Sequence, residues 1–169
     1  FFTVIYPLAV WGIAQFAANS GKGELIEHNG RTYYANIGQA FTEDRYFWSR
    51  PSAVDYNASG SGGSNKGPSN PDYLATVQAR IDTFMMHNPE VRKSDIPSDL
   101  VTASGSGEDP NISIQGAFVQ IPRIAKIRNI PVGQLEALVQ QNTEEPLLGL
   151  LGTNKVNVLQ LNLCLNTLK

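Results

Sequence analysis

The N-terminal segment is apolar over its whole length. Residues 1–18, FFTVIYPLAVWGIAQFAA, include no charged side chain, and only Thr3 and Gln15 are clearly polar. A helix that crosses a bilayer needs about 20 such residues. Large apolar residues occur all around this segment rather than along one stripe, which favours lipid over a single protein face. We therefore expect an incomplete transmembrane helix at 1–18. A buried core helix is the alternative, and a signal peptide is disfavoured because no basic region precedes the run.

The segment that follows has the pattern of a β-hairpin. Short runs with apolar and aromatic residues at 24–27 and 31–34 flank the dipeptide Asn29-Gly30. Asn-Gly between two such runs is a strong signal for a tight hairpin turn. We expect two short antiparallel strands here.

Residues 72–87 have the spacing of an amphipathic helix. Asn70 can cap its start, Pro71 suits the first helical position, and Asp72 suits the positive end of the helix dipole. The apolar positions recur at intervals of three and four, and they are Leu74, Val77, Ile81, Phe84 and Met85.

A second helical pattern runs from a cap at Ser113 to Lys126 and Arg128, which suit the negative end of a helix. Pro122 lies inside this pattern and predicts a kink or a break. Its apolar positions are Ile114, Ala117, Ile121, Ile124 and Ala125.

The C-terminal region predicts another helix, from Pro131, with Leu135, Leu138 and Val139 facing inward. In residues 156–165 leucine at every second position favours a strand, whereas Asn157-x-x-Gln160 resembles a capping box. We expect a brief strand followed by a helix. The resulting fold class is α+β, with early hairpin strands and later helices in one soluble domain over 19–169.

Composition excludes several kinds of site. The formal net charge of −2 and a pI near 5.7 give no basic surface for nucleic acid. Cys164 is the single cysteine, and with only His28 and His87 beside it no Cys/His group has metal-ligand spacing. We therefore expect no metal site.

Two Ser/Gly-rich loops, at 59–71 and 100–110, raise the question of phosphate binding. Neither matches the P-loop G-x-x-x-x-G-K-[ST] or the dinucleotide pattern G-x-G-x-x-G. A flexible linker is disfavoured in the first loop, because its two prolines and two asparagines are typical of defined turns. We expect ordered, turn-rich loops.

Catalytic groupings are weak in this sequence. Neither histidine has a recognisable triad setting, and His87 suits the negative end of the helix that it closes. The pairs Glu43-Asp44 and Glu108-Asp109 are expected to be solvated loop charges. In the segment 46–51, YFWSRP, either Arg50 lies on an aromatic face or the segment packs as an ordered loop.

Several ordered blocks resemble one family. They are IGQAF at 37–41, YFWSRPSA at 46–53, SGGSN at 61–65 with SNP at 69–71, DLVTASGSG at 99–107 with DP at 109–110, and VNVLQLNL at 156–163. In this order they are similar to the C subunit of the bacterial Kdp potassium-transporting P-type ATPase, over nearly the full chain.

The resemblance implies a non-catalytic accessory subunit that joins a channel-like subunit to an ATP-hydrolysing subunit in the bacterial inner membrane. The family is described as a catalytic chaperone that raises ATP affinity, which implies ATP as a transient shared ligand and no tightly bound cofactor. Gln120 matches the glutamine proposed to touch nucleotide, and the other interpretation of Gln120 is a solvated helix residue beside the proline kink. The candidate subunit contacts in the motif loops are Arg50, Pro51, Ser61, Gly63, Asn65, Asn70, Thr102, Ser104, Asp109 and Arg123.

A single membrane pass with a cytoplasmic N-terminus would put the soluble domain outside the cell, as a brace near the potassium entrance, where no ATP is available. A membrane-tethered hydrolase acting at Ser61, Ser104 or Ser106 of the Ser/Gly loops is the alternative function.

Overall fold

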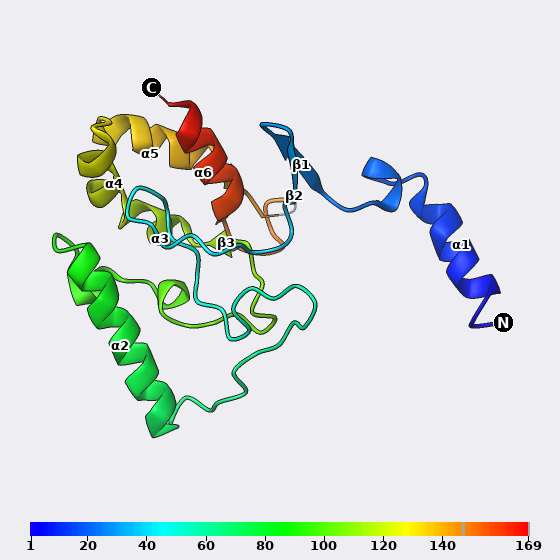
Figure 1. Ribbon diagram of the computed structural model, residues 1–169, viewed down its shortest axis with the longest axis horizontal. Helices are drawn as coiled ribbons and strands as arrows, with labels where there is room; N and C mark the ends of the chain where they lie inside the picture. The colour runs from blue at the N-terminus through cyan, green and yellow to red at the C-terminus, as the bar shows by residue number, and fades with distance from the viewer. Residues whose placement is uncertain (147, 169) are drawn as a thin grey trace. The chain divides into compact units, whose positions relative to one another are not determined.

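The computed structural model describes residues 1–146 and 148–168, which form two compact units, Phe1–Asn36 and Ile37–Lys169. The secondary structure is mixed helix and short antiparallel sheet, as the α+β prediction requires (Figure 1). The predicted division after residue 18 rests on the membrane interpretation and stays a prediction.

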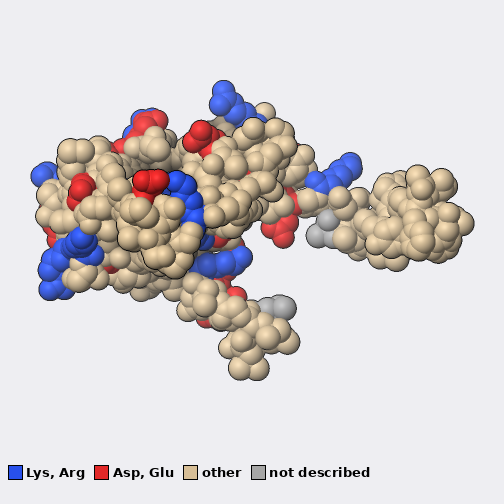
Figure 2. Space-filling model, turned by 90° about the horizontal axis from the view of Figure 1, so that it is seen from below, with Lys and Arg blue, Asp and Glu red and all other residues tan. Residues whose placement is uncertain are grey.

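The first unit consists of an exposed helix, a 3-10 turn and a hairpin. Helix α1 (Ile5–Ala14) has no buried residue, and Figure 2 shows its surface without acidic or basic side chains. Among the described residues, no helix is both long enough and apolar enough to span a bilayer. The 3-10 turn η1 (Ala18–Gly21) follows α1.

The predicted hairpin is confirmed. Strand β1 (Leu25–His28) pairs antiparallel with β2 (Arg31–Tyr34), in a register that sets His28 opposite Arg31. The turn residues Asn29 and Gly30 have φ of 50° and 73°. Two successive positive φ values define a type I′ turn, for which Asn-Gly is the preferred sequence.

The second unit begins with long ordered loops and the helix α2 (Pro71–His87). The remaining elements follow in chain order: η2 (Lys93–Asp95), η3 (Ser98–Leu100), β3 (Asn111–Ile112), α3 (Ile114–Phe118), α4 (Ile121–Arg128), α5 (Val132–Gln141), β4 (Thr143–Glu144), β5 (Lys155–Asn157) and α6 (Val158–Thr167). The three short strands form an antiparallel sheet in the order β3-β5-β4. Helix α5 contacts α3, α4 and α6.

Side-chain caps begin the helices where the sequence predicts them. The side-chain oxygens of Asn70, Ser113 and Asn157 each accept a hydrogen bond from the backbone N–H three residues later, at 3.0 to 3.1 Å. The predicted break is also present, because α3 ends at Phe118 and α4 begins at Ile121 with Pro122 in its first turn. A proline is tolerated there, since the first amides of a helix have no intrahelical acceptor.

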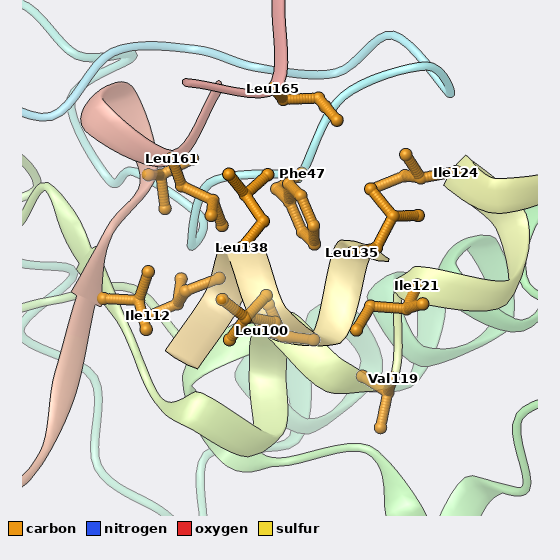
Figure 3. Close-up of a cluster of buried hydrophobic side chains, with 14 of the residues drawn as sticks. Phe47, Leu100, Ile112, Val119, Ile121, Ile124, Leu135, Leu138, Leu161 and Leu165 are labelled. Atoms are coloured by element: carbon orange, nitrogen blue, oxygen red, sulfur yellow. The ribbon is translucent and has the colours of Figure 1, made fainter. Parts of the chain in front are cut away.

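One hydrophobic core lies between the helices, the sheet and the loop around Phe47 (Figure 3). The predicted inward residues Leu135, Leu138 and Val139 are all buried. The helix predicted at 72–87 is confirmed as α2, in which Phe84 is buried and Leu74 is 52% exposed. The buried apolar side chains drawn and labelled in Figure 3 are Phe47, Leu100, Ile112, Val119, Ile121, Ile124, Leu135, Leu138, Leu161 and Leu165.

Candidate functional site

Two buried amide side chains hold the backbone of Phe47 and Trp48. Asn162 of α6 accepts from the N–H of Phe47 and donates to its carbonyl oxygen, both at 2.9 Å. Gln120 accepts from the N–H of Trp48 at 2.7 Å, and its Nε2 lies 3.5 Å from the carbonyl oxygen of Trp48. We call these four contacts the amide clamp. The clamp gives an irregular buried segment the hydrogen bonds that a neighbouring strand would otherwise provide.

Arg123 packs directly against the amide clamp. Its Nη2 donates to Oε1 of Gln120 at 2.8 Å, its Nε donates to Oδ1 of Asn88 at 2.9 Å, and its Nη1 donates to the carbonyl oxygen of Asp44. The guanidinium carbon also lies 4.8 Å from the ring centroid of Trp48, within the range of a cation–π contact. Gln120 and Arg123 reach the same place because residues three apart share one face at the start of a helix.

The charge of Arg123 is buried yet retained at neutral pH. Burial lowers the pKa of Arg123 to about 10, and the carboxylate of Asp44, 3.7 Å from Nη1, acts in the opposite direction. Nδ1 of His87 lies 2.8 Å from the same carboxylate, and the His87 ring is 5.0 Å from that of Trp48. Asp44 therefore links the end of α2 to the beginning of α4.

A cavity of about 330 Å³ opens beside this network, between the end of α2 and α4. The charged or titratable groups of its lining are those of Arg123, Asp44, His87, Lys126 and Glu90. The first three of these already pair with one another or with protein carbonyls, so the arrangement stabilises the packing of two helices. A nucleophile beside a base, which covalent catalysis needs, is not part of this lining.

The two Ser/Gly loops lie against each other, which supports the prediction that they are ordered. The N–H of Gly62 donates to the carbonyl oxygen of Ser106 at 2.8 Å. A Cβ added to Gly107, whose φ is 73°, would lie 2.6 Å from the side chain of Val54. At Gly63 it would lie 3.0 Å from the carbonyl oxygen of Gly105. A side chain at Gly107 would therefore clash, and one at Gly63 would force its neighbour to shift.

Arg50 and Asp109 fix the base of the second loop. Nη1 of Arg50 lies 2.7 Å from Oδ2 of Asp109, and both side chains are mostly buried. Oδ1 of Asp109 accepts from the backbone N–H of Asn111 at 3.0 Å. The hydroxyl of Tyr56 donates to the carbonyl oxygen of Arg50 at 2.5 Å. The Arg50–Asp109 ion pair, the turn at Asp109 and the hydroxyl of Tyr56 therefore stabilise one another.

Two of the three serines that the hydrolase alternative invokes, Ser104 and Ser106, have structural partners. Oγ of Ser104 accepts from the N–H of Gly107 at 2.9 Å, and Oγ of Ser106 accepts from that of Glu108 at 3.2 Å. Such bonds are typical of serines in turns. Neither His28 nor His87 is a hydrogen-bond partner of these serines within the part of the chain that the structure describes.

The candidate contact residues do not form one cluster in the structure. Arg123 is in the buried network, Arg50 and Asp109 form the ion pair, and Asn70 caps α2. Ser61 and Asn65 are exposed in the first loop, where Asn65 has a φ of 52°. The remaining candidates are half-buried loop residues, namely Pro51, Gly63, Thr102 and Ser104.

Three sequence interpretations need correction. Gln120 is not a solvated residue beside the proline, because its side chain is 0% exposed in the amide clamp. Asp44 and Asp109 are not simply solvated loop charges, since each carboxylate pairs with an arginine, Arg123 and Arg50 respectively. Arg50 pairs with a carboxylate rather than an aromatic face, so the ordered-loop interpretation of residues 46–51 is the correct one. The three described cation–π contacts use Arg45, Arg123 and Arg128.

Two further residues of the site, Asn88 and Asn162, have partners that the sequence does not indicate. Asn88 and Asn162 are polar residues 3% and 1% exposed, and each meets its partner far away in the chain. Asn162 interrupts an apolar helix face. This position indicates that Asn162 is buried, but it does not indicate which residue it bonds. Within residues 1–146 and 148–168 no group of three His, Cys, Asp or Glu side chains is arranged to hold a metal ion.

The fold and the site together define a small α+β module whose buried polar side chains brace its own loops. More particularly, the chain belongs to the KdpC family, described as K+-transporting ATPase, c chain, whose sequence profile matches residues 1–167.

Individual relatives are similar over almost their full length. A potassium-transporting ATPase KdpC subunit from Flavobacterium psychrophilum is 57% identical over 169 residues, which cover 99% of this chain and 91% of the relative. The KdpC subunit of Bacteroides fragilis strain YCH46 is 50% identical over 173 residues, covering 100% and 91%. That of Caldanaerobacter subterraneus subsp. tengcongensis is 44% identical over 164 residues, covering 96% and 85%.

Proposed function

We propose that the chain is a non-catalytic accessory subunit of an ATP-driven potassium uptake pump, which joins and stabilises its channel-like and ATP-hydrolysing subunits. The match to the KdpC family over residues 1–167 carries this proposal. The hydrogen bonds of Ser104, Gln120 and Arg123 support the non-catalytic part of the proposal, because these polar side chains bind other groups of the same domain.

Co-purification tests the role in assembly. The chain carries an affinity tag and is co-expressed with the other subunits, and the detergent-solubilised complex is then isolated through the tag. We expect both partner subunits in stoichiometric amounts, and potassium-stimulated ATP hydrolysis that is lost when the chain is omitted. Isolation of the chain alone, with full hydrolysis in its absence, would contradict the proposal.

The proposal places residues 1–18 in the bacterial inner membrane as part of a single pass, with the soluble domain on the external side. The apolar sequence of the segment and its uncharged surface support this placement (Figure 2). Lys66→Cys, at an exposed position, tests it in whole cells with a membrane-impermeant thiol reagent. The background is Cys164→Ser, which removes the native thiol. Labelling only after cell lysis would refute the external placement.

For nucleotide, the proposal is that ATP is a transient ligand shared with the hydrolytic subunit, whose ATP affinity this chain raises. Direct contact between ATP and Gln120 requires Gln120 to leave the amide clamp, since its oxygen and its nitrogen are both bound within the domain. An effect transmitted through the clamp requires no such movement.

Two variants distinguish direct contact from an effect of the clamp. Gln120→Ala removes the side chain proposed to touch nucleotide, whereas Asn162→Ala opens the other half of the clamp and leaves Gln120 in place. The measurement is the apparent ATP affinity of the purified complex. Equal weakening by both variants indicates an effect through the clamp. Weakening by Gln120→Ala alone indicates contact. If the apparent ATP affinity is unchanged in both variants, neither Gln120 nor the amide clamp contributes to ATP binding.

A further inference from the structure

A groove of about 590 Å³ lies between α2 and the loop that follows the amide clamp. The aromatic rings of Trp48 and Phe84 line it, together with Thr76, Ala79 and Thr83 from one face of α2. This volume lies within the range of 300–1,000 Å³ that is typical of ligand sites. We call this feature the α2 groove. Leu100, the first residue of the second Ser/Gly loop, is the only lining residue from either of those loops among the described residues.

Helix α2 is bonded to the rest of the unit from its middle to its C-terminal end. Phe84 is its one buried residue, Arg80 donates to the carbonyl oxygen of Val101, and Gln78 accepts from Nζ of Lys93. The groove-facing residues Thr76, Ala79 and Thr83 are all exposed. One wall of the α2 groove is therefore a helix face that is open to solvent.

The two walls of the α2 groove carry opposite charges that lack ionic partners. Arg80 projects from α2 and donates from Nη1 to the carbonyl oxygen of Val101 at 3.1 Å. Asp55 belongs to the loop wall and is exposed. Neither residue forms an ion pair with any other described residue. An occupant of complementary charge would satisfy both, since such pairs set the orientation of a partner.

A strained turn fixes the position of Asp55. Asp55 and Tyr56 have successive positive φ values of 52° and 56°, which are unfavourable for residues with side chains. Oγ of Ser52 accepts from the N–H groups of Val54 and Tyr56 at 3.1 and 2.9 Å, and so maintains the turn. The turn therefore fixes the backbone of Asp55 in the loop wall of the groove.

We propose that the α2 groove binds a polypeptide segment of another pump subunit, in which an apolar side chain lies between a basic and an acidic residue. The apolar side chain packs on Trp48 and Phe84, the basic residue pairs with Asp55, and the acidic residue pairs with Arg80. A polypeptide fits the groove because its helix wall is open to solvent and its two walls carry opposite charges, with which the mixed side chains of one segment can pair. This inference rests on the proposed function, since it supplies one contact of the assembled pump.

Two alanines on the same helix give a matched test. Ala79 lines the α2 groove, whereas Ala75, also exposed, does not. A photo-crosslinking amino acid replaces each in turn in the full chain, within the co-expressed pump. We expect a cross-link from position 79 to another subunit and none from position 75. Ala79→Trp should reduce the amount of that subunit that co-purifies by at least fivefold. Ala75→Trp should leave it unchanged, with equal thermal melting of both variants.

The charges are tested in the same assay. Asp55→Lys and Arg80→Glu should each weaken co-purification several-fold, because each places like charges in contact. Equal cross-linking from both positions would overturn the proposal, as would a cross-link only to lipid, to a small molecule or to a second copy of this chain. If the wild-type chain assembles but Ala79→Trp assembles equally well, the groove proposal fails and the accessory role stands. If the wild-type chain does not assemble, both fail.

Discussion

Gln120 pairs with the backbone of Trp48 as one strand pairs with another, with Oε1 accepting from the N–H at 2.7 Å and Nε2 lying 3.5 Å from the carbonyl oxygen. Its amide nitrogen also donates to the carbonyl oxygen of Gly116 at 2.8 Å, and its oxygen accepts from Arg123 at 2.8 Å. One glutamine between α3 and α4 therefore connects a distant loop, a helix end and a buried cation.

Gln120→Ala should destabilise the domain by roughly 2–4 kcal/mol, because it leaves the N–H of Trp48 and one N–H of Arg123 without acceptors inside the protein. Urea unfolding of the purified chain, followed by circular dichroism, measures the change. Gln115→Ala is the matched control, because Gln115 is an exposed residue of α3. Its stability should stay close to that of the wild type. Equal stability of the two variants would show that the hydrogen bonds of Gln120 contribute nothing.

Gly107→Ala should destabilise the domain by roughly 2–4 kcal/mol, through the left-handed backbone and the contact of the new Cβ with Val54. Gly105→Ala is a control in the same loop, because a Cβ there meets no atom within 4 Å. Thermal melting of both variants makes the comparison. A melting temperature of Gly107→Ala that matches that of Gly105→Ala would contradict the close approach of the two loops.

A double-mutant cycle on Arg50 and Asp109 should give a coupling free energy of about 1–3 kcal/mol, because the pair is mostly shielded from water. The variants Arg50→Ala, Asp109→Ala and their combination are compared by urea unfolding. The exposed pair Arg92 and Asp95 provides the control cycle, for which the coupling should be indistinguishable from zero. Coupling of the same size in both cycles would mean that burial does not strengthen the first pair.

Tyr56 should make stability depend on alkaline pH. Burial raises the pKa of Tyr56 above 10, with smaller opposing effects from Ser49, Arg80 and Arg50. Between the unfolded and the folded pKa the unfolded chain holds fewer protons, so the free energy of unfolding falls as pH rises through that window. The difference in stability between wild type and Tyr56→Phe should therefore shrink above pH 10. A constant difference from about pH 8 to 11 would show that the pKa of Tyr56 is not raised.

The local elements could be predicted from the sequence because each depends on neighbouring residues. Asn29-Gly30 defines its turn through backbone preference, and Asn70 and Ser113 cap the next turn of their own helices. Pro122 marks the break before α4 because its ring cannot fit inside a continuous helix. In each case the physical cause lies within about four residues.

The candidate site was less predictable because its partners are distant in sequence. Asn162 lies 115 residues from Phe47, and Gln120 lies 72 residues from Trp48. No periodicity connects such pairs, so Gln120 could be noticed through the family resemblance while its burial could not be foreseen. The same limit explains Asp44, whose adjacent glutamate made it look like a solvated charge until the fold brought His87 and Arg123 to it.

The contact between Gly62 and Ser106 has a consequence for the order in which the domain folds. It joins residues far apart in sequence, and glycine loses more backbone entropy on ordering than any other residue. Helix α2, formed by local interactions, has no such delay. The Ser/Gly loops should therefore order late, and on the newly made chain they would be flexible until their partner loop is in place. Resistance of these loops to proteolysis would then mark the moment at which folding is complete.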